Sequence, residues 1–202
     1  DGSYYLADTD NHVIRRVETN NMMSTVAGDG SAGYGGDGAA ATNAQLDTPR
    51  GIAIGKDGSL YIADSGNHVI RRLYTNGTIT TVAGTGVAGF SGDGSNSVVA
   101  RLNAPRGVAV EPDGTFYIAD TENNRIRRVA PDGTILTVAG DGTAGYWGDG
   151  GRGLDAQLNQ PQGIGFGSGG LLIADTDNHR IRKLGKDGRI ATFAGNGTSG
   201  YS

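Results

Sequence analysis

The sequence predicts an all-β array of repeated, four-stranded antiparallel units, and two observations lead to this prediction. First, one motif occurs four times, at 5–17, 61–73, 117–129 and 172–184. Its marker residues, Asp8, Asp64, Asp120 and Asp175, follow one another at spacings of 56, 56 and 55 residues. A fixed period of this size indicates stacked or radially arranged units that bury their apolar faces against one another. Second, glycines recur at fixed offsets, so the 37 glycines are turn residues rather than a low-complexity linker.

The second unit shows why four strands are expected in each repeat. Asp57-Gly58 and Asn76-Gly77 each separate two short apolar runs. Such dipeptides favour hairpin turns because glycine accepts the positive φ that these turns require. A polar, turn-like segment lies at 65–68. The strands predicted for this unit are 51–55, 59–64, 69–74 and 79–84.

The repeats predict a single array over residues 1–202 rather than several domains. The units are 1–28, which lacks its first strand, 51–84, 107–140 and 163–195. Long inserts follow the units at 29–50, 85–106, 141–162 and 196–202, and a short helical piece is expected at 40–46. Because both ends of the chain fall inside repeats, we expect the chain to be an excerpt of a longer array.

Composition excludes several classes of function. The net charge of −4 and the pI of about 5.3 lack the basic excess that phosphate contacts require, so nucleic acid is not an expected partner. The chain has no cysteine, which rules out disulfides and cysteine-bearing zinc sites. No apolar run approaches the roughly 20 residues of a membrane span, so direct membrane insertion is not expected. No targeting segment fixes the compartment, and an extracellular or cell-surface location is favoured.

The motif strand-Asp-x-x-Asn-x-x-Ile-Arg, followed by a further strand and a Pro-x-Gly start to the next unit, resembles NHL repeats. The Gly-[Phe/Tyr]-x-Gly-Asp-Gly loops resemble the long-insert bacterial form of these repeats, and the resemblance covers essentially the whole chain. It implies a β-propeller with four-stranded blades, of which just under four are present, whereas such rings typically have about six. Teneurins carry a similar propeller with adhesion as its role, and some intracellular relatives bind RNA or protein, so the resemblance alone implies no single function.

The repeated aspartates and histidines are the first candidates for chemistry, and both favour a structural role. A calcium site needs about six to eight converging oxygen ligands, whereas each turn offers two acids at most. We therefore expect each aspartate to accept backbone N–H bonds within its own turn. His12, His68 and His179 share one repeat position, occupied by Asn124 in the third unit, so they are spread around the array. We expect no catalytic residue, metal or cofactor.

The third strand of each unit carries two adjacent basic residues, as in Arg71-Arg72. Neighbouring strand residues point to opposite faces, which argues against one concentrated basic patch. We expect one member of each pair to extend over apolar surface or to pair with a carboxylate between units, and the other to be solvated.

The aromatic residues of the inserts are the remaining candidates. They are Tyr34, Phe90, Tyr146, Trp147 and Tyr201. An aromatic residue among glycines either packs onto its own unit or anchors a partner, and we favour packing for the repeated Tyr/Phe position. Trp147 differs because glycine and serine occupy its position in the other inserts. The predicted binding residues are Trp147, Tyr146, Phe90, Tyr34, and the arginines that end the first two inserts, Arg50 and Arg106.

These observations predict a non-enzymatic module for protein or glycan binding, or for adhesion, through the face that collects the inserts. Loops on a rigid scaffold commonly carry binding. A rival interpretation is a lyase-like, hydrolase-like or small-ligand-binding propeller with a metal in a central channel lined by 51–55, 107–111 and 163–166. A third interpretation is self-association through the open edges of the array.

Overall fold

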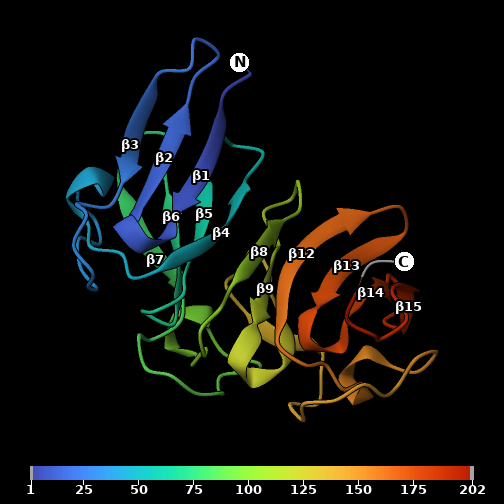
Figure 1. Ribbon diagram of the computed structural model, residues 1–202. Helices are drawn as coiled ribbons and strands as arrows, with labels where there is room; N and C mark the ends of the chain where they lie inside the picture. Colours follow the sequence, from blue (N-terminus) through green and yellow to red (C-terminus); the bar gives the residue numbers. More distant parts are fainter. Residues whose placement is uncertain (1, 201–202) are drawn as a thin grey trace.

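The computed structural model describes residues 2–200, in which β-strands and short 3-10 helices are the regular elements. The fifteen strands of these residues form four antiparallel sheets, which we call blades 1 to 4 in chain order (Figure 1). Blade 1 has three strands and each other blade has four, with consecutive strands paired. The structure therefore confirms an all-β, propeller-type fold with just under four blades. Tyr201, the aromatic residue of the last insert, lies outside the described residues.

The strands follow the repeat. Blade 1 contains β1 (Tyr4–Asp8), β2 (Val13–Val17) and β3 (Met23–Ala27). Blade 2 contains β4 (Pro49–Ile54), β5 (Leu60–Asp64), β6 (Val69–Leu73) and β7 (Ile79–Ala83). Blade 3 contains β8 (Gly107–Val110), β9 (Phe116–Asp120), β10 (Arg125–Val129) and β11 (Ile135–Ala139). Blade 4 contains β12 (Pro161–Gly167), β13 (Gly170–Asp175), β14 (Arg180–Gly185) and β15 (Ile190–Ala194).

Two kinds of turn carry the 3-10 helices. Three of them lead into the last strand but one of a blade: η1 (Thr9–Asn11) joins β1 to β2, η4 (Thr121–Asn123) joins β9 to β10, and η6 (Thr176–Asn178) joins β13 to β14. The others lie in the inserts: η2 (Ala41–Asn43), η3 (Ser97–Val99) and η5 (Gly153–Asp155). The helical piece expected at 40–46 is therefore a three-residue 3-10 helix, one turn rather than an amphipathic α-helix.

A β-bulge lies at the same place in every blade, in the pairing of the last two strands. In blade 2 the register shifts between Ile70 and Arg71, and in blade 3 between Ile126 and Arg127. A bulge turns the strand locally and redirects the next side chain. Here it lies directly before the first arginine of the basic pair, which is fully buried in both blades.

The apolar core is divided among the three interfaces between neighbouring blades. One cluster joins Tyr61 and Ile70 of blade 2 to Phe116 and Ile118 of blade 3, and equivalent clusters lie between blades 1 and 2 and between blades 3 and 4. Because each blade buries its apolar faces only against its neighbours, the array is one continuous body, as expected for a repeat protein.

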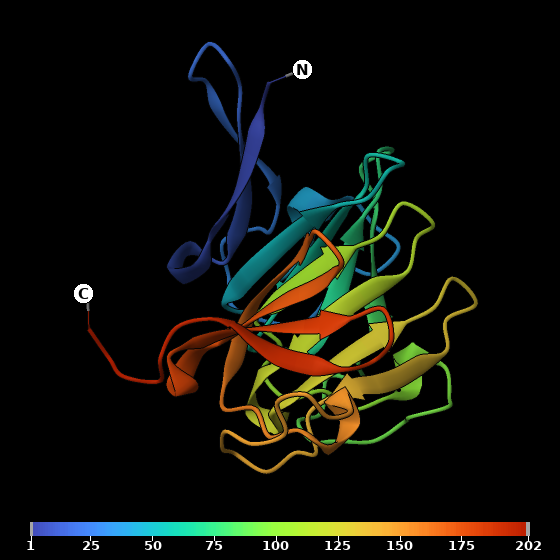
Figure 2. The ribbon, with the colours of Figure 1, turned by 90° about the vertical axis from the view of Figure 1, so that its right-hand side faces the viewer.

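Each insert runs along the last strand of the following blade as far as its last hairpin turn: the N–H of Gly38 donates to the carbonyl of Ile79, and that of Ala41 donates to the carbonyl of Gly77. Figure 2 shows the green insert after blade 2 and the gold insert after blade 3 at the bottom of the molecule, the side they also occupy in Figure 1. The first strands of successive blades contact one another, β4 with β8 and β8 with β12. The inserts thus lie along successive blades, and we call the surface that they form the insert face.

Candidate functional site on the insert face

Each blade holds a carboxylate and a guanidinium together beneath the insert face. In blade 2, Arg71 Nη1 lies 3.4 Å from Asp64 Oδ2, and both side chains are fully buried. The same pair occurs in blade 4, where Arg182 and Asp175 are 3.2 Å apart. Burial raises the pKa of Asp64 to about 6, although hydrogen bonds from Asn67 and from a backbone N–H oppose the shift. The pKa of Asp64 thus still lies below neutral pH, so this carboxylate is ionised beside Arg71 at pH 7.

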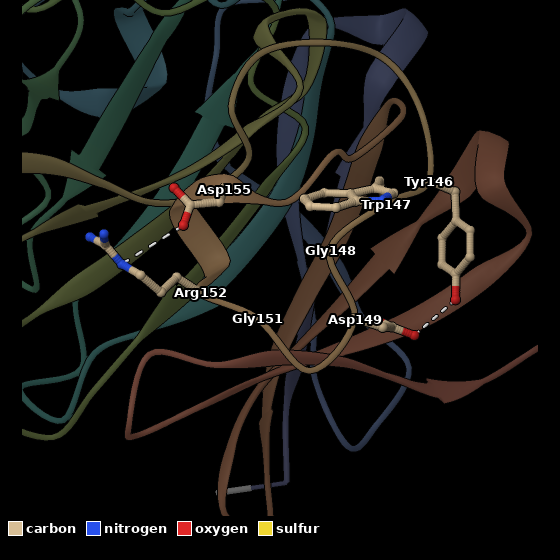
Figure 3. Close-up of a pocket in the computed structure, with 7 residues that line it drawn as sticks. All are labelled: Tyr146, Trp147, Gly148, Asp149, Gly151, Arg152 and Asp155. Carbon is tan, nitrogen blue, oxygen red and sulfur yellow. Dashed lines mark hydrogen bonds and ion pairs between the residues drawn. The ribbon is translucent and has the colours of Figure 1, made fainter.

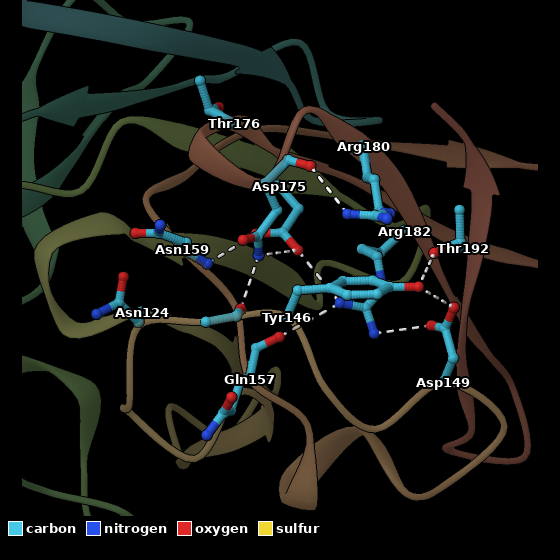
Figure 4. A network of polar contacts seen from close by, with 12 residues as sticks. Asn124, Tyr146, Asp149, Gln157, Asn159, Asp175, Thr176, Arg180, Arg182 and Thr192 are labelled. Atoms are coloured by element: carbon cyan, nitrogen blue, oxygen red, sulfur yellow. Dashed lines mark hydrogen bonds and ion pairs between the residues drawn. The ribbon is translucent and has the colours of Figure 1, made fainter. Parts of the chain in front are cut away.

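The preceding insert supplies a second carboxylate to each buried arginine. Asp37 Oδ1 lies 2.7 Å from Arg71 Nη2, and Asp149 Oδ1 lies 2.8 Å from Arg182 Nη2. Figure 4 shows this network in blade 4, where the Arg182 guanidinium lies between Asp149 and Asp175. One planar guanidinium thus contacts a carboxylate of the blade and one of the insert, a geometry that suits arginine and not lysine.

The repeated aspartates accept backbone N–H bonds, as expected, but the donors are not the ones expected. Asp64 Oδ1 accepts the backbone N–H of Asp47 at 2.7 Å, and Asp120 Oδ1 accepts that of Asn103 in the same way. These donors belong to the preceding insert and not to the aspartate's own turn, whose contribution is the side-chain amide of Asn67. The long-range partner could not be read from the turn sequence alone.

In each basic pair the first residue has the expected environment, whereas the environment of the second differs from the expected one. The first arginine is buried and paired with carboxylates, as described above. The second is not simply solvated: Arg72 Nη2 lies 2.6 Å from Asp57 Oδ2, and its guanidinium lies over the rings of Tyr61 and Tyr74. Cation–π stacking and the ion pair keep this side chain along the blade.

The repeated aromatic residues pack, but onto the following blade. The Tyr146 ring lies over Arg180, with 3.6 Å from Cζ to the ring centroid, and over Arg182 (Figure 4). Its hydroxyl donates to Asp149 at 2.8 Å and is 3.1 Å from Thr192 Oγ1. Burial alone would raise the pKa of Asp149, but the hydrogen bonds from Thr192 and Tyr146, with the charge of Arg182, outweigh it and lower the pKa.

The equivalent residues in the other inserts occupy the same kind of place. Phe90 lies over Arg125 and Arg127, and Tyr34 lies over Arg71 with its hydroxyl 3.0 Å from Thr81 Oγ1. Tyr34, Phe90 and Tyr146 nonetheless remain 40–48% exposed. Packing and partial exposure therefore coexist at this position.

The histidine position joins neighbouring repeats. The backbone N–H of Ala104 donates to His68 Nδ1 at 3.0 Å, and that of Gln160 donates to Asn124 Oδ1 at 2.9 Å. His68 and Asn124 both have positive φ, 56° and 52°. This position requires a side chain that accepts a hydrogen bond and a backbone with positive φ. Asparagine satisfies both requirements. The three histidines thus lie in three different blades, and Asn124 takes the position in blade 3.

Trp147 lines a surface hollow in the third insert, with Tyr146 on the same segment (Figure 3). The hollow has a volume of about 450 Å³, and its other lining residues include Arg152 and Asp155. Trp147 is 67% exposed. Its carbonyl accepts the N–H of Gln157 at 3.1 Å, so the backbone beneath the indole is held in place.

Gly148 allows the tight turn that follows Trp147. Its φ is 98°, and a Cβ at this position would lie 2.8 Å from Cα of Ala156. Only glycine fits both restrictions. The indole is therefore presented from a closely packed loop.

The other predicted binding residues do not join this hollow. Phe90 and Tyr34 lie on other inserts over other blades, as described above. Arg50 is exposed at the start of β4. Arg106 lies just before β8, with Nη2 3.5 Å from Glu122 Oε1. Of the six predicted residues, the structure brings Tyr146 and Trp147 into one hollow.

Arg152 and Asp155 were missed by the sequence analysis although a signal for them was present. Their positions hold Ala40 and Asn43 in the first insert, and Asn96 and Val99 in the second. The comparison of units that singled out Trp147 would also single out this pair. Their atoms Nε and Oδ2 are 4.0 Å apart, and the side chains are 71% and 61% exposed.

Neither a group of metal-binding side chains nor a membrane-spanning helix is found among residues 2–200. Residues 2–200 contain no cluster of three histidine or acidic side chains placed to hold a metal ion. Within the same residues, no helix has the length and apolarity to cross a membrane.

Blades of four sequential antiparallel strands, joined by inserts that lock onto the following blade, define a repeat protein of the β-propeller class. The family model of the teneurin NHL domain matches residues 30–90 and 86–145, and that of the NHL repeat matches 158–184. The chain belongs to the NHL-repeat family, and most of the match is of the teneurin type. Teneurin-m of Drosophila melanogaster is 35% identical over 223 aligned residues, which cover 96% of this chain and 8% of Teneurin-m.

Solved structures show the same fold at low sequence identity. An auxiliary nutrient binding protein from Bacteroides ovatus has a TM-score of 0.70 and 23% identity, over 96% of this chain and 46% of that one. Virginiamycin B lyase from Staphylococcus aureus has a TM-score of 0.59 and 17% identity, over 96% of this chain and 52% of that one. A binding protein and an enzyme share this architecture, so function must be argued from the site.

Proposed function

We propose that this chain is a non-enzymatic module that binds a protein partner at the hollow around Trp147. The observation that supports the proposal is that three side chains absent from the other inserts, Trp147, Arg152 and Asp155, line the same hollow. A residue that occurs in every repeat is expected to stabilise the fold. Residues that depart from the repeat and lie together are better candidates for binding.

The chemistry of the hollow favours a protein partner over a glycan. Tryptophan, tyrosine and arginine are the residues that most often dominate the energy of protein interfaces. Trp147, Tyr146 and Arg152 bring all three types to one place. Arg152 and Asp155 are only loosely paired and largely exposed, so each can exchange its neighbour for a partner group of opposite charge.

The loop that carries the hollow is already ordered by the blade beneath it. Asp149 and Tyr146 are held by Arg182 and Arg180, as described above. A preformed loop loses less conformational entropy on binding than a flexible one. Adhesion at a cell surface is the form of this function that the teneurin-type match supports, and an extracellular location belongs to the same proposal.

The channel-enzyme alternative receives less support. The carboxylates with a pKa shifted by burial, such as Asp64 and Asp120, repeat from blade to blade in contact with a buried arginine. A shifted pKa indicates a catalytic group most strongly where it is unique and lies in a cleft. The likeness to the lyase is a likeness of fold.

Site-specific photocrosslinking tests the proposal. A photoreactive residue at Leu154, which is 40% exposed beside the hollow, should label a discrete partner among cell-surface proteins of the source organism. The same residue at Met22, which is 65% exposed in blade 1, is the matched control. We expect Trp147→Ala to abolish labelling at 154, and unlabelled wild-type chain to compete. Labelling that is equal at both positions, or unchanged by Trp147→Ala, would contradict the proposal.

A further inference from the structure

Two arginines lie directly opposite each other where the third insert meets the hairpin turn before β15. Arg152 and Arg189 form an isolated antiparallel bridge between these two segments. Directly opposed residues of such a pair project their side chains to the same side, with Cβ atoms about 5 Å apart. Both arginines are exposed. Their two positive charges therefore share one small area of the surface, which we call the arginine pair.

The arginine pair departs from the repeat at both positions. The same bridge joins the first insert to blade 2 through Ala40 and Thr78, and the second insert to blade 3 through Asn96 and Thr134. Neither of these two bridges contains a charged residue. Like charges directly opposite each other destabilise a strand pair. The arginine pair thus lowers stability at a bridge that forms elsewhere without it, as is expected of residues that bind a partner.

The exposure of the arginine pair is a property of this place in the repeat. Ala40 and Asn96 are exposed, and Thr78 and Thr134 are partly exposed, although blades 3 and 4 follow. Leu136, two residues beyond Thr134 on the last strand of blade 3, is 44% exposed with blade 4 present. The last strand of a blade is therefore open to solvent even where another blade follows.

The guanidinium of Arg189 is oriented by a neutral group. Its Nη1 donates to the carbonyl of Gly150 at 2.6 Å. The acid nearest to it in sequence is Asp187, whose Oδ1 accepts the backbone N–H of Arg189 at 3.1 Å. Among residues 2–200, no carboxylate forms an ion pair with the Arg189 guanidinium. This side chain is thus held in place while its charge is not compensated.

Arg152 has one weak acidic neighbour. Its Nε lies 4.0 Å from Oδ2 of Asp155, beyond hydrogen-bonding distance, and the two side chains are 71% and 61% exposed. An exposed ion pair of this kind contributes little to stability. Asp155 would repel an incoming carboxylate, but solvent and salt screen this repulsion, and two adjacent guanidinium groups oppose it. Arg152 can therefore accept a second, closer carboxylate.

The arginine pair adjoins the hollow around Trp147, because Arg152 lines that hollow. Figure 3 shows Arg152 and Tyr146 on opposite sides of the hollow, with the indole of Trp147 between them in this view. A group bound by the arginine pair would therefore lie beside the apolar surface that the indole offers.

We propose that Arg152 and Arg189 together bind an acidic side chain of the protein partner whose apolar residue covers Trp147. This inference rests on the proposed function and specifies the chemistry of the partner. A planar carboxylate suits two guanidinium groups, because each guanidinium can donate parallel N–H bonds to carboxylate oxygens. Binding also relieves the repulsion between the two arginines. The partner segment thus carries an aspartate or glutamate next to an apolar side chain.

A titration of the full chain with a short peptide tests this inference. The probe is the synthetic peptide acetyl-Gly-Glu-Leu-Gly-amide, in which glutamate carries the only charge. The readout is the NMR signals of the arginine Nε–Hε groups in ¹⁵N-labelled chain. We expect the signals of Arg152 and Arg189 to shift and saturate. The same peptide with glutamine in place of glutamate should cause no saturable shift.

Variants of the chain identify the residues that bind the peptide. We expect the dissociation constant to rise about tenfold in Arg189→Gln, because charge-assisted hydrogen bonds are lost. Arg152→Gln should have a similar effect. Arg50→Gln removes the same charge from another exposed arginine, so it is the matched control and should bind as the wild type.

Three results would overturn the inference. They are equal binding of the glutamine peptide, unchanged binding in both Arg152→Gln and Arg189→Gln, and tighter binding of inorganic phosphate than of the glutamate peptide at equal ionic strength.

Photocrosslinking at Leu154 separates this inference from the proposed function. If Trp147→Ala abolishes labelling but Arg189→Gln leaves it unchanged, the partner binds at the hollow without the arginine pair, and this inference alone fails. If no partner is labelled while the glutamate peptide still binds the arginine pair, the proposed function fails and the carboxylate site stands.

Discussion

In blade 3, Arg127 Nη2 lies 2.8 Å from Oδ1 of Asp93, a carboxylate that arrives from the insert between blades 2 and 3. The same guanidinium contacts Asp120 of the blade itself at 3.2 Å. Arg127 and Asp120 are fully buried, whereas Asp93 is 37% exposed. A single buried cation therefore ties the insert to the sheet, and the position of the insert on the blade depends on this contact.

Replacing Asp93 by alanine should loosen the insert and destabilise the chain. Arg127 keeps Asp120 but loses its second carboxylate, and because Asp93 is partly solvated we expect a loss of about 1 kcal/mol. Hydrogen exchange should rise over 85–106, which the contact holds on the blade. Denaturant midpoints and exchange rates measure the two effects. Asp177→Ala, at an exposed acid, is the control, and equal behaviour of the two variants would show that the contact does not hold the insert.

The histidine position should tolerate asparagine and not alanine. His68→Asn keeps an acceptor for the N–H of Ala104 and suits a φ of 56°. His68→Ala removes the acceptor and places alanine in a left-handed conformation, so we expect a loss of about 1–3 kcal/mol. Thermal unfolding of both variants measures the difference. The structural role would be refuted if the alanine variant were as stable as the asparagine variant.

Much of the fold could be predicted from the sequence, because the period and the hairpin dipeptides act locally. The four strands of blade 2 begin and end within two residues of the predicted bounds. The prediction was least complete where partners lie far apart in the chain. Asp64 bonds to an N–H 17 residues earlier, and Tyr34 contacts a threonine 47 residues later. No local pattern specifies such contacts.

For the candidate site, too, local features could be predicted from the sequence and long-range contacts could not. Trp147 stood out in the sequence because it departs from the repeat, but the sequence could not show that Arg152 and Asp155 line the same hollow. Their convergence depends on the loop formed by Gly148 and on the 3-10 helix η5. Phe90 and Tyr34 were grouped with Trp147 by residue type, whereas the fold places them over separate blades.

The buried aspartates predict an unusual dependence of stability on pH. Burial raises the pKa of Asp64 from 3.8 to about 6. Between these values the folded chain binds a proton that the unfolded chain does not, so the contribution of Asp64 to stability falls as pH rises from 4 to 6. A shift of this size corresponds to at most about 3 kcal/mol.

Asp64→Asn isolates this effect, because the other acids titrate in both proteins. The free energy of unfolding of the wild type minus that of the variant should decrease from pH 4 to 6 and be constant above pH 7. Asp57→Asn is the control: hydrogen bonds from Ser59 hold the pKa of Asp57 at about 2, so its difference should be flat above pH 4 and fall only in more acidic solution. A difference for Asp64→Asn that rises between pH 4 and 6 would mean that Arg71 outweighs burial.

Truncation of two adjacent aromatic residues should change the stability of the chain to different extents. Tyr146 stacks on Arg180 and donates to Asp149, so we expect Tyr146→Ala to lose about 1–2 kcal/mol of stability. Trp147 is 67% exposed, so Trp147→Ala should change stability by no more than about 0.5 kcal/mol.

Fluorescence gives an independent measurement, because Trp147 is the only tryptophan of the chain. Its emission should be that of a solvated indole, with acrylamide quenching close to that of free tryptophan and with little change on unfolding. Quenching should decrease when a partner covers the hollow, and Arg152→Ala should reduce that protection. Blue-shifted emission that resists acrylamide in the isolated chain would show that the indole is already buried, and the hollow would then lose its most exposed contact residue.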